Sequence, residues 1–465
     1  MTAPVPAPAP AARPLLDGRL AVVVAYTAAM CMNGLDSTIV NPALYTIAGD
    51  FGRPVEAANA VETAFLVGLA AGLPAAGRLG DRYGVKRVFL AALAAFTLAS
   101  ALCAAAPGLG ALAAARAVQG VAGGLLTPVG MTLLFRAFAP HERAGLGKVL
   151  IVPTALMPAL GPPLGGFLTE RLSWHWLFLV NVPIGVAAVA VGLVGLRAGE
   201  EPPAGRFDTT GFLLATPGLG LLTYALGFGP AQGWSSPGVL VSGVAGAGLL
   251  ILAVRHQLGA AEPLVDLRLL ADRTFGAATW LALLTSAGLM GALFVLPLLY
   301  QVALGVSALD AGLSVFPEAV GLMAASHVVD RLLPRLGPRR LALPALLLAA
   351  AVLAALAVTE GPWAVRALMF AVGLVLGTAV LTLQIAGFAD VPPPATGRAM
   401  ALFTIVRTLG GALGIAATAA LIGLLADGDN PTPYRIALLA TALLIATGTP
   451  LATRFPGKPP AGMTP

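Results

Sequence analysis

The sequence predicts an all-helical integral membrane protein, and three observations support this class. The chain of 465 residues is 58% apolar and only 10% charged, whereas charged residues make up about 25% of soluble domains. Its mean hydropathy is +0.89. Long apolar runs recur along the whole chain, and open strands cannot cross lipid because their backbone groups would stay unpaired.

A helix that crosses a bilayer needs about 20 mostly apolar residues. Fourteen runs meet this requirement, and most of the charged residues lie in the short segments between them. The predicted spans are residues 20–44, 57–76, 88–106, 110–135, 149–169, 176–196, 209–228, 237–254, 275–300, 308–329, 341–359, 363–388, 400–425 and 434–453.

Lys and Arg residues are distributed unevenly over the segments between these spans. With the N-terminus inside, 21 of the 27 basic residues fall in cytoplasmic segments, four in outer segments and two within spans. Positive charge is enriched in cytoplasmic loops, so we expect both termini to be cytoplasmic. The four outer residues are Arg53, Arg171, Arg366 and Arg435.

The two ends of the chain lack apolar runs. Residues 1–18 alternate Ala with Pro, which disfavours helix and predicts a disordered tail. They lack the basic start and cleavage context of a secretory signal. Residues 454–465 are predicted to form a cytoplasmic tail. Cys31 and Cys103 lie inside apolar runs, so we expect buried thiols and not a disulfide.

A weak internal repeat relates two basic loops. Four residues of the loop after the second span recur after the tenth span, each 253 positions later. The pairs are Arg78 and Arg331, Arg82 and Arg335, Gly84 and Gly337, and Arg87 and Arg340. Two parallel six-helix halves separated by two extra helices produce this offset, and such halves are a transporter architecture. The predicted units are residues 19–197, a linker at 198–273 with the two additional spans, and residues 274–453.

Several motifs in order resemble those of the major facilitator superfamily, and more narrowly its fourteen-helix drug:proton antiporters of the EmrB/QacA type. The motifs are LDSTIVNPALYTI (35–47), GRLGDRYGVKR (77–87), RAVQG (116–120), GPPLGGFL (161–168), WHWLFLVNVPIG (174–185), PLVDLRLLADRTF (263–275) and RTLGGALG (407–414). The resemblance covers nearly the whole chain. It implies the major facilitator fold, with two six-helix bundles and two extra central helices, in the inner (plasma) membrane.

The resemblance also implies residues that gate transport. In the loop of residues 77–87, Asp81 would hold the two halves together on the cytoplasmic side through arginines and a helix start. Glycines there would allow a tight turn, and small residues one turn apart in the fifth span would let helices approach closely. The predicted gating residues are Gly77, Arg78, Asp81, Arg82, Gly84, Arg87, Gly161, Pro162, Gly165 and Gly166.

Ionisable residues inside spans are candidates for chemistry, because each costs about 2.5–3.5 kcal/mol at the bilayer centre. Asp36, Glu62 and Arg116 lie at similar depth in three spans, and Gln119 is nearly on the face of Arg116. We expect a polar cluster in the outer half of the first bundle, where a carboxylate releases a proton as substrate arrives. A permanent ion pair for Asp36 and an interfacial position for Glu62 are the alternatives.

Two further charged residues lie within spans of the second half. Glu318 follows Pro317 in the tenth span and is predicted to carry a proton or bind a cationic substrate, with pairing to a distant arginine as the alternative. Arg407 lies in the thirteenth span, where a structural role is the alternative to substrate binding. The predicted substrate-binding residues are Asn33, Asn41, Gln119, Glu318 and Arg407.

The predicted function is export of small, cationic or amphiphilic compounds in exchange for protons by alternating access. The alternatives are a dedicated exporter of one endogenous metabolite and, more distantly, a membrane sensor or scaffold. Four scattered histidines give no metal spacing, no phosphate-binding loop is present, and no nucleophile–base pair indicates an enzyme. We therefore expect no cofactor beyond the proton gradient, no metal, no nucleic-acid partner and a functional monomer in the lipid bilayer.

Overall fold

The computed structural model describes residues 18–40, 43–53, 55–138, 142, 156–196, 207–300, 313–392, 395–425 and 430–457. Within these ranges the regular structure is helical and no β-strand occurs. The predicted N-terminal tail lies almost entirely outside the described residues, as do Asn41 and the last eight residues of the predicted C-terminal tail.

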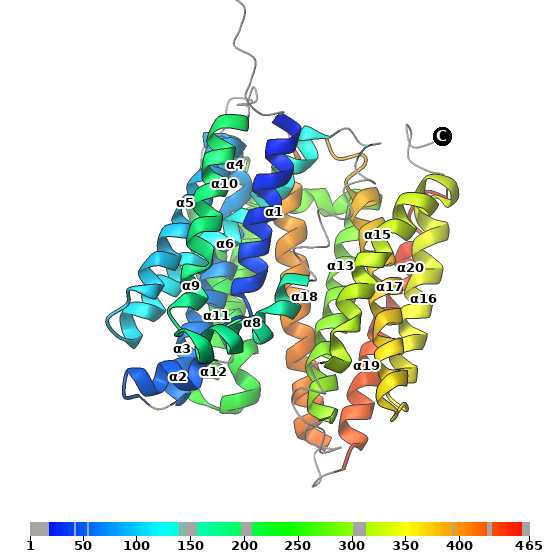
Figure 1. The fold of residues 1–465 in the computed structure, drawn as a ribbon. Helices are drawn as coiled ribbons and strands as arrows, with labels where there is room; N and C mark the ends of the chain where they lie inside the picture. The colour runs from blue at the N-terminus through cyan, green and yellow to red at the C-terminus, as the bar shows by residue number, and fades with distance from the viewer. Residues whose placement is uncertain are drawn as a thin grey trace, which may run out of the picture.

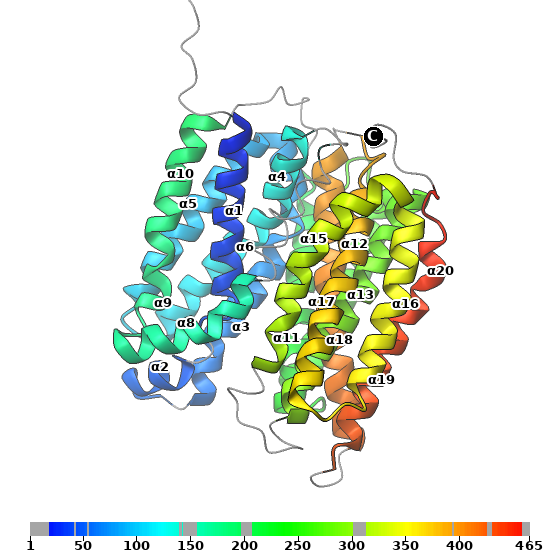
Figure 2. The ribbon, with the colours of Figure 1, turned by 45° about the vertical axis from the view of Figure 1, so that its right-hand side comes forward.

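The first half of the chain forms one helical bundle. Its helices are α1 (Gly18–Asp36), α2 (Leu44–Asp50), α3 (Val55–Gly72), α4 (Ala75–Tyr83), α5 (Val85–Ala104), α6 (Leu109–Ala137), α8 (Met157–Arg171), α9 (Trp176–Leu179) and α10 (Asn181–Gly195). In Figures 1 and 2, α5 and α10 lie on the side of this bundle that faces away from the second half, and α1 lies between α10 and the second half in Figure 1.

The second half forms another bundle, which two helices and a short connection precede. The preceding elements are α11 (Thr209–Gln232), α12 (Pro237–Gly259) and the 3-10 helix η4 (Leu267–Ala271). The second bundle contains α13 (Arg273–Leu298), α15 (Pro317–Leu336), α16 (Pro338–Leu356), α17 (Pro362–Gly387), α18 (Thr396–Leu425), α19 (Thr432–Thr447) and α20 (Thr449–Ala452). Figure 1 shows the two bundles side by side.

The described helices are compatible with fourteen spans. Eleven are long and apolar enough to cross a membrane, and α3 with α4 forms a twelfth that is bent by 55°. The remaining two spans correspond to α8 and α15. In both cases the first part of the predicted span lies outside the described ranges. The prediction of an all-helical membrane protein is confirmed. The first span is shorter than predicted, since α1 ends at Asp36 and residues 37–40 form a turn.

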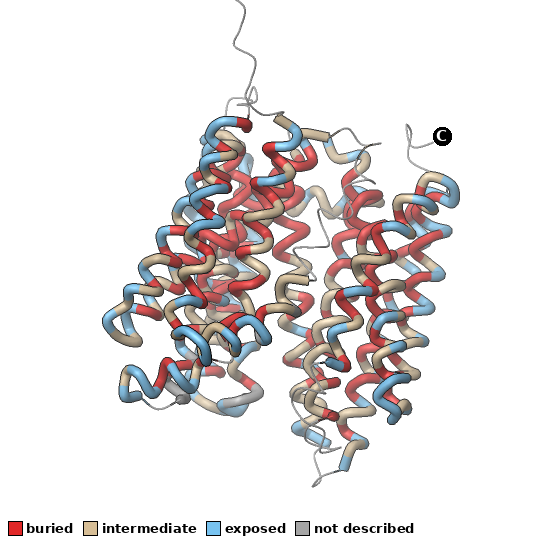
Figure 3. Tube along the Cα trace, viewed as in Figure 1, coloured by how far each residue is buried: buried red, intermediate tan, exposed pale blue. Residues whose placement is uncertain are grey.

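Glycines bring α3 and α6 into backbone contact. A Cβ atom at Gly68 would lie 2.2 Å from the Ala117 carbonyl oxygen, and one at Gly120 would lie 2.1 Å from the Phe65 oxygen. Small residues permit such close approach between membrane helices. Figure 3 shows that buried residues lie mainly on the inner faces of the helices in both halves.

The same contacts recur between α15 and α17, 253 residues later. A Cβ at Gly321 would lie 2.1 Å from the Phe370 oxygen, and one at Gly373 would lie 1.9 Å from the Glu318 oxygen. Each of these four residues lies 253 positions after its counterpart in the contacts between α3 and α6. Gly84 and Gly337 also share a positive φ, at 94° and 79°. The repeat inferred from two loops therefore extends through the helix packing.

The turn between the second and third spans differs from the prediction. Gly77 and Gly80 lie inside α4, and only Gly84 adopts the left-handed conformation that ends this helix. Gly77 instead permits close packing, since a Cβ there would lie 3.0 Å from the Arg398 Cα at the start of α18. The glycine-rich sequence thus encodes a short helix against the other half, not an extended tight turn.

The two extra helices lie beside the first bundle. Thr216 of α11 donates a hydrogen bond to the Ala71 carbonyl oxygen at 3.2 Å, and Gly220 packs near Val67 of α3. Helix α12 is the least buried of the candidate membrane spans in the described ranges. The position of this hairpin is peripheral.

Candidate functional site

Arg116 of α6 lies at the centre of a buried polar cluster in the first bundle. Its guanidinium forms an ion pair with Asp36 of α1, and neither side chain is exposed. The Nη2 atom also lies 3.5 Å from Glu62 Oε2 of α3. The structure therefore brings together the three charged residues that the sequence placed at similar depth. The Glu62 side chain is 19% exposed.

Uncharged polar side chains complete the cluster. Gln119 accepts a hydrogen bond from Arg116 at 3.0 Å and donates one to Ser100 of α5 at 2.7 Å. Asn181 at the start of α10 donates to Asp36 Oδ1 at 3.0 Å. The sequence analysis missed Ser100 and Asn181. Asn181 lies in the quoted 174–185 motif, and a lone amide in an apolar run was the available signal.

Two aromatic rings enclose the arginine. The Cζ atom of Arg116 lies 4.1 Å from the centroid of Phe65 and 5.7 Å from that of Phe178. A cation over an aromatic face gains electrostatic stabilisation that is larger in a desolvated site. The two rings carry no charge. The positive charge of Arg116 can therefore be balanced only by the two carboxyl groups of the cluster.

The cluster holds one permanent positive charge against two carboxyl groups. When both carboxyl groups are ionised it carries one net negative charge, and burial of uncompensated charge is strongly unfavourable. Glu62 Oε2 lacks a hydrogen-bond partner in the described part of the chain. A proton, a cation or access to water can each remove the imbalance. The arrangement can therefore exchange one positive species for another.

The remaining predicted substrate-binding residues are dispersed. Asn33 of α1 donates to Thr127 at 3.4 Å, and Asn41 lies outside the described residues. Arg407 of α18 makes no hydrogen bond or ion pair within the described ranges, but its charge lies within electrostatic range of the Tyr26 hydroxyl on α1. Tyr26 and Arg407 lie in opposite halves of the chain, on α1 and α18.

Glu318 lies apart from the first cluster, at the start of α15. It is 7% exposed, and its Oε1 atom has no hydrogen-bond partner within the described ranges. Pairing with a distant arginine is not seen among those residues. An unpaired acid at this depth carries a cost, so it is a second position where a proton or a cation can bind.

Asp81 joins α4 to the start of α18. Its Oδ2 lies 3.5 Å from Arg398 Nε and its Oδ1 lies 3.7 Å from Arg136 Nη2. A carboxylate at a helix N-terminus is also favoured by the helix dipole. Arg78 is buried and donates to the Pro263 oxygen at 3.2 Å. Arg82 is exposed and stacks on Tyr83, while Arg87 is exposed at the start of α5.

Aromatic side chains surround the same end of the halves. Phe388, directly after α17, packs edge-on against Phe135 of α6, Phe275 of α13 and Phe403 of α18, with centroid distances of 5.3 to 5.8 Å. Edge-to-face pairs of this kind add to the stabilisation from area burial. The ion pairs of Asp81 and this aromatic cluster together close the bundle at the end that carries α4, which we call the α4 end.

The α8 glycines lie against the turn of residues 37–40 that follows α1. A Cβ at Gly161 would lie 1.9 Å from Thr38 Oγ1, and one at Gly165 would lie 2.1 Å from the Ile39 oxygen. Gly166, in contrast, has nothing within 4 Å of its Cβ position. The helix continues through Pro162 to Arg171. Gly161 and Gly165 therefore set the distance between α8 and this turn, and Gly166 does not.

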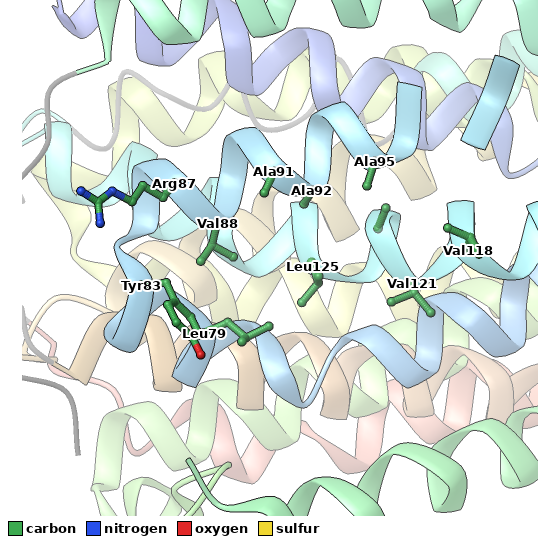
Figure 4. A pocket seen from close by; sticks show the side chains of 11 residues that line it. Leu79, Tyr83, Arg87, Val88, Ala91, Ala92, Ala95, Val118, Val121 and Leu125 are labelled. Carbon is green, nitrogen blue, oxygen red and sulfur yellow. The ribbon is translucent and has the colours of Figure 1, made fainter. Parts of the chain in front are cut away.

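A groove of about 540 Å³ lies on the opposite face of α6 from Arg116. Figure 4 shows its apolar lining from α4, α5 and α6, with Arg87 at one end. No group of three metal-ligating side chains occurs among the described residues. The polar cluster and this groove are thus separate features.

Two membrane bundles related by a repeat, with buried charges inside and a closure at one end, define a membrane transporter. A sequence profile of the Major Facilitator Superfamily matches residues 26–415, and the chain belongs to this superfamily.

Relatives and solved structures agree with this assignment. The chain is 32% identical to a multidrug resistance protein B homolog of Mycobacterium tuberculosis, covering 90% of this chain and 81% of the relative. It is 33% identical to a putative multidrug resistance protein MdtD of Serratia proteamaculans, covering 84% and 83%. The human organic anion transporter MFSD10 (TETRAN) shares the fold, with a TM-score of 0.68 at 16% identity and coverage of 93% and 99%. The proton:xylose symporter XylE gives 0.63 at 13% identity, covering 96% and 98%. The protein is a transporter and not an enzyme.

Proposed function

We propose that this chain exports small amphiphilic compounds in exchange for protons by alternating access. The observation that carries the proposal is the cluster of one buried arginine and two carboxyl groups, Arg116, Asp36 and Glu62. One bound proton neutralises the cluster, and loss of that proton requires a compensating cation or hydration. The names of the multidrug resistance relatives support small-molecule export.

Proton exchange would be linked to the movement of the halves. Asp36, Glu62 and Arg116 come from α1, α3 and α6, so any change in their charge alters the packing of three helices. The contact at Gly165 between α8 and the turn after α1 and the contact at Gly77 between α4 and α18 involve backbone atoms, and packed interfaces of this kind switch between discrete arrangements. Neutralisation favours one packing of the first bundle and ionisation favours another.

The proposed substrate class rests on two charged residues that have no hydrogen-bond or ion-pair partner among the described residues. Glu318 lies buried on α15, and Arg407 lies on α18. An acid without a partner in the described part of the chain favours a cationic or zwitterionic cargo, which replaces the proton as counter-ion. We assign Glu318 to substrate or proton binding and Arg407 to substrate binding.

The membrane orientation is part of the same proposal. The loops at the α4 end hold most of the basic residues, so we place this end and both termini in the cytoplasm, in the inner membrane. Substrate would be released to the outside while Asp81 holds the cytoplasmic end closed, as in the present structure, and would enter from the cytoplasm when this end opens. The cluster and the closure both lie within one chain, which supports a monomeric unit driven by the proton gradient alone.

Transport in liposomes tests the proposal. Purified protein is reconstituted with a pH-sensitive dye inside, and a panel of cationic, zwitterionic, neutral and anionic amphiphiles is added outside. We expect cationic amphiphiles to drive proton movement and an imposed pH difference to accelerate their uptake. Transport at the same rate with and without a pH difference would contradict proton exchange, and a response to a single compound would indicate a dedicated exporter.

A further inference from the structure

The groove on the far face of α6 is a site that the transport cycle leaves unused. Its walls are apolar, and several lining residues are exposed, including Val118 at 54% and Val121 at 40%. Because they lie in membrane spans on the face away from Arg116, these side chains face lipid and not the polar cluster. A volume of about 540 Å³ is within the range of about 300–1,000 Å³ typical of ligand sites.

The dimensions of the groove fit one leaflet. It extends along α5 from Arg87 to Ala95, which is about 12 Å at about 1.5 Å per residue. One leaflet is half of a hydrocarbon core of about 30 Å. Arg87 lies at the α4 end of the groove, where the span meets the membrane interface (Figure 4).

The charge at the groove mouth is positive and available. Arg87 is exposed and makes no ion pair or hydrogen bond with any residue that the structure describes. The neighbouring Lys86 is already engaged with the Leu196 oxygen. A basic side chain at the end of an apolar cleft between spans matches a phosphate attached to an acyl chain.

We propose that this groove binds an anionic phospholipid, with one acyl chain against α5 and α6 and the phosphate at Arg87. The lipid would fill the gap between α4, α5 and α6 and stabilise the packing of the helices that carry Asp81 and Arg116. This binding does not depend on transport, so its test is independent of the proposed function.

Native mass spectrometry of the purified protein tests this site. The protein is titrated with phosphatidylglycerol or phosphatidylethanolamine of the same acyl chains. The variants are Arg87→Gln, which removes the charge, Ala95→Phe, which fills the groove, and Arg340→Gln, the equally exposed counterpart 253 residues later, as the control. A thermal melt of each variant shows that it is folded.

We expect the wild-type protein to retain phosphatidylglycerol over phosphatidylethanolamine. Arg87→Gln should lower the retention roughly fivefold, in line with the contribution of one basic residue near an anionic surface, and Ala95→Phe should remove it. Equal retention of the two lipids, unchanged retention in a folded Ala95→Phe protein, or an equal loss in Arg340→Gln would each overturn the site.

A different set of contacts concerns residues 260–272, which connect α12 to α13 and which we call the strap. On the first half, Arg78 of α4 donates to the Pro263 oxygen at 3.2 Å and lies 3.6 Å from Glu262 Oε2. On the second half, Asp266 Oδ2 lies 3.5 Å from Arg398 Nη1. The same guanidinium contacts Asp81, so Arg398 is shared between α4 and the strap.

The strap is fixed to the extra helices as well. The Leu264 N–H donates to Asp208 at 3.2 Å and the Val265 N–H donates to Gln257 at 3.3 Å, while both apolar side chains are buried. Arg268 donates to the Leu258 oxygen at 3.3 Å at the end of α12. The strap is therefore a packed segment that contacts both halves across the α4 end.

The geometry points to Asp266 and Glu262 as gating residues that act by positioning Arg398 and Arg78. If α4 and α18 separate, the strap cannot keep its contacts with both arginines, so these contacts favour the closed α4 end. This inference rests on the proposed alternating access. It also gives the two extra helices a function, since they hold the strap.

Distance measurements between spin labels test the strap without any transport assay. Labels at Tyr83→Cys and Leu336→Cys, an exposed pair separated by 253 residues, report the opening of the α4 end. Asp266→Asn should raise the open population by roughly two- to fivefold, the effect of one partly exposed ion pair. Asp272→Asn is the control, because Asp272 caps α13 and is not seen to contact either arginine.

Asp81→Asn distinguishes a strap that has no gating role from an α4 end that is not the gate. If Asp81→Asn opens the α4 end and Asp266→Asn does not, the strap has no gating role. If Asp266→Asn and Asp272→Asn act alike, the effect belongs to the connection as a whole and the assignment of Asp266 is wrong. If Asp81→Asn also leaves the distances unchanged, the α4 end is not the gate and the proposed cycle itself fails.

Discussion

Asp36 of α1 and Arg116 of α6 form an ion pair from which solvent is fully excluded. Removing two charges from water costs several kcal/mol per ion, and their attraction offsets this cost only if other groups complete the hydrogen bonding. Asn181 and Gln119 supply that completion, whereas Glu62 adds a second acid that one arginine cannot neutralise. The pair is therefore stable as a unit and sensitive to the protonation of its neighbour.

Replacement of Asp36 by Asn should abolish proton exchange while the protein still folds. Asn keeps the size and much of the hydrogen bonding of Asp36 but cannot release a proton. We expect the substrate-driven efflux of protons from the liposome interior to disappear in liposomes that contain this variant. Asp50→Asn is the matched control, because Asp50 accepts a hydrogen bond from Trp174 outside the cluster. Full coupling in Asp36→Asn would eliminate this carboxylate as the proton carrier.

Replacement of Arg116 by Gln should destabilise the protein strongly. It leaves Asp36 and Glu62 buried without a counter-charge, and breaking a buried pair in this way costs about 3–5 kcal/mol. We expect a large fall in the thermal melting temperature of Arg116→Gln and substantial recovery in the double variant Arg116→Gln/Asp36→Asn. If the second substitution brought no recovery, the charge imbalance would not be the cause.

Charged residues within spans could be placed from the sequence, whereas an uncharged amide, distant ion-pair partners and a packing glycine could not. Asp36, Glu62 and Arg116 could be placed together because charge is rare in spans and helix direction fixes depth. Asn181 could not, since a single uncharged amide in an apolar run gives little signal. Arg398 and Asp266 lie far along the chain from Asp81, and no local pattern predicts such partners. Gly77 was assigned to a turn because glycine serves both turns and close helix packing.

Replacement of Gly165 by Ala should impair the protein much more than replacement of Gly166. A Cβ at Gly165 would lie 2.1 Å from the Ile39 oxygen, so α8 and the turn after α1 must separate, whereas the Gly166 position is open. Overpacking of this kind costs about 1–3 kcal/mol. Melting temperature and transport rate of the two variants provide the measurement. Equal effects would mean that the distance between α8 and this turn is unimportant.

Replacement of Glu318 by Gln should stabilise the protein and reduce transport of cations. The substitution removes a buried charge whose Oε1 atom has no hydrogen-bond partner in the described ranges, and unfavourable groups retained in a structure often serve function. We expect a higher melting temperature together with slower uptake of cationic substrates and unchanged uptake of neutral ones. Glu360→Gln, at an exposed pair with Arg435, is the control. Unchanged uptake of every cation tested would remove Glu318 from the substrate path.

Replacement of Asp208 by Asn should weaken the attachment of the extra helices in a pH-dependent manner. Burial alone would raise the pKa of Asp208, but hydrogen bonds from the Gly211 and Leu264 N–H groups and from His256 outweigh it and hold the pKa below its ordinary value of 3.8. A lowered pKa means that the carboxylate contributes stability above that ordinary value and loses it as the pH falls through the folded-state pKa. At neutral pH the variant should lose about 1–3 kcal/mol, the cost of weakened charge-assisted hydrogen bonds. Melting temperatures of the two proteins should differ at neutral pH and converge toward strongly acidic pH, and a gap that widened on acidification would contradict this role for the carboxylate.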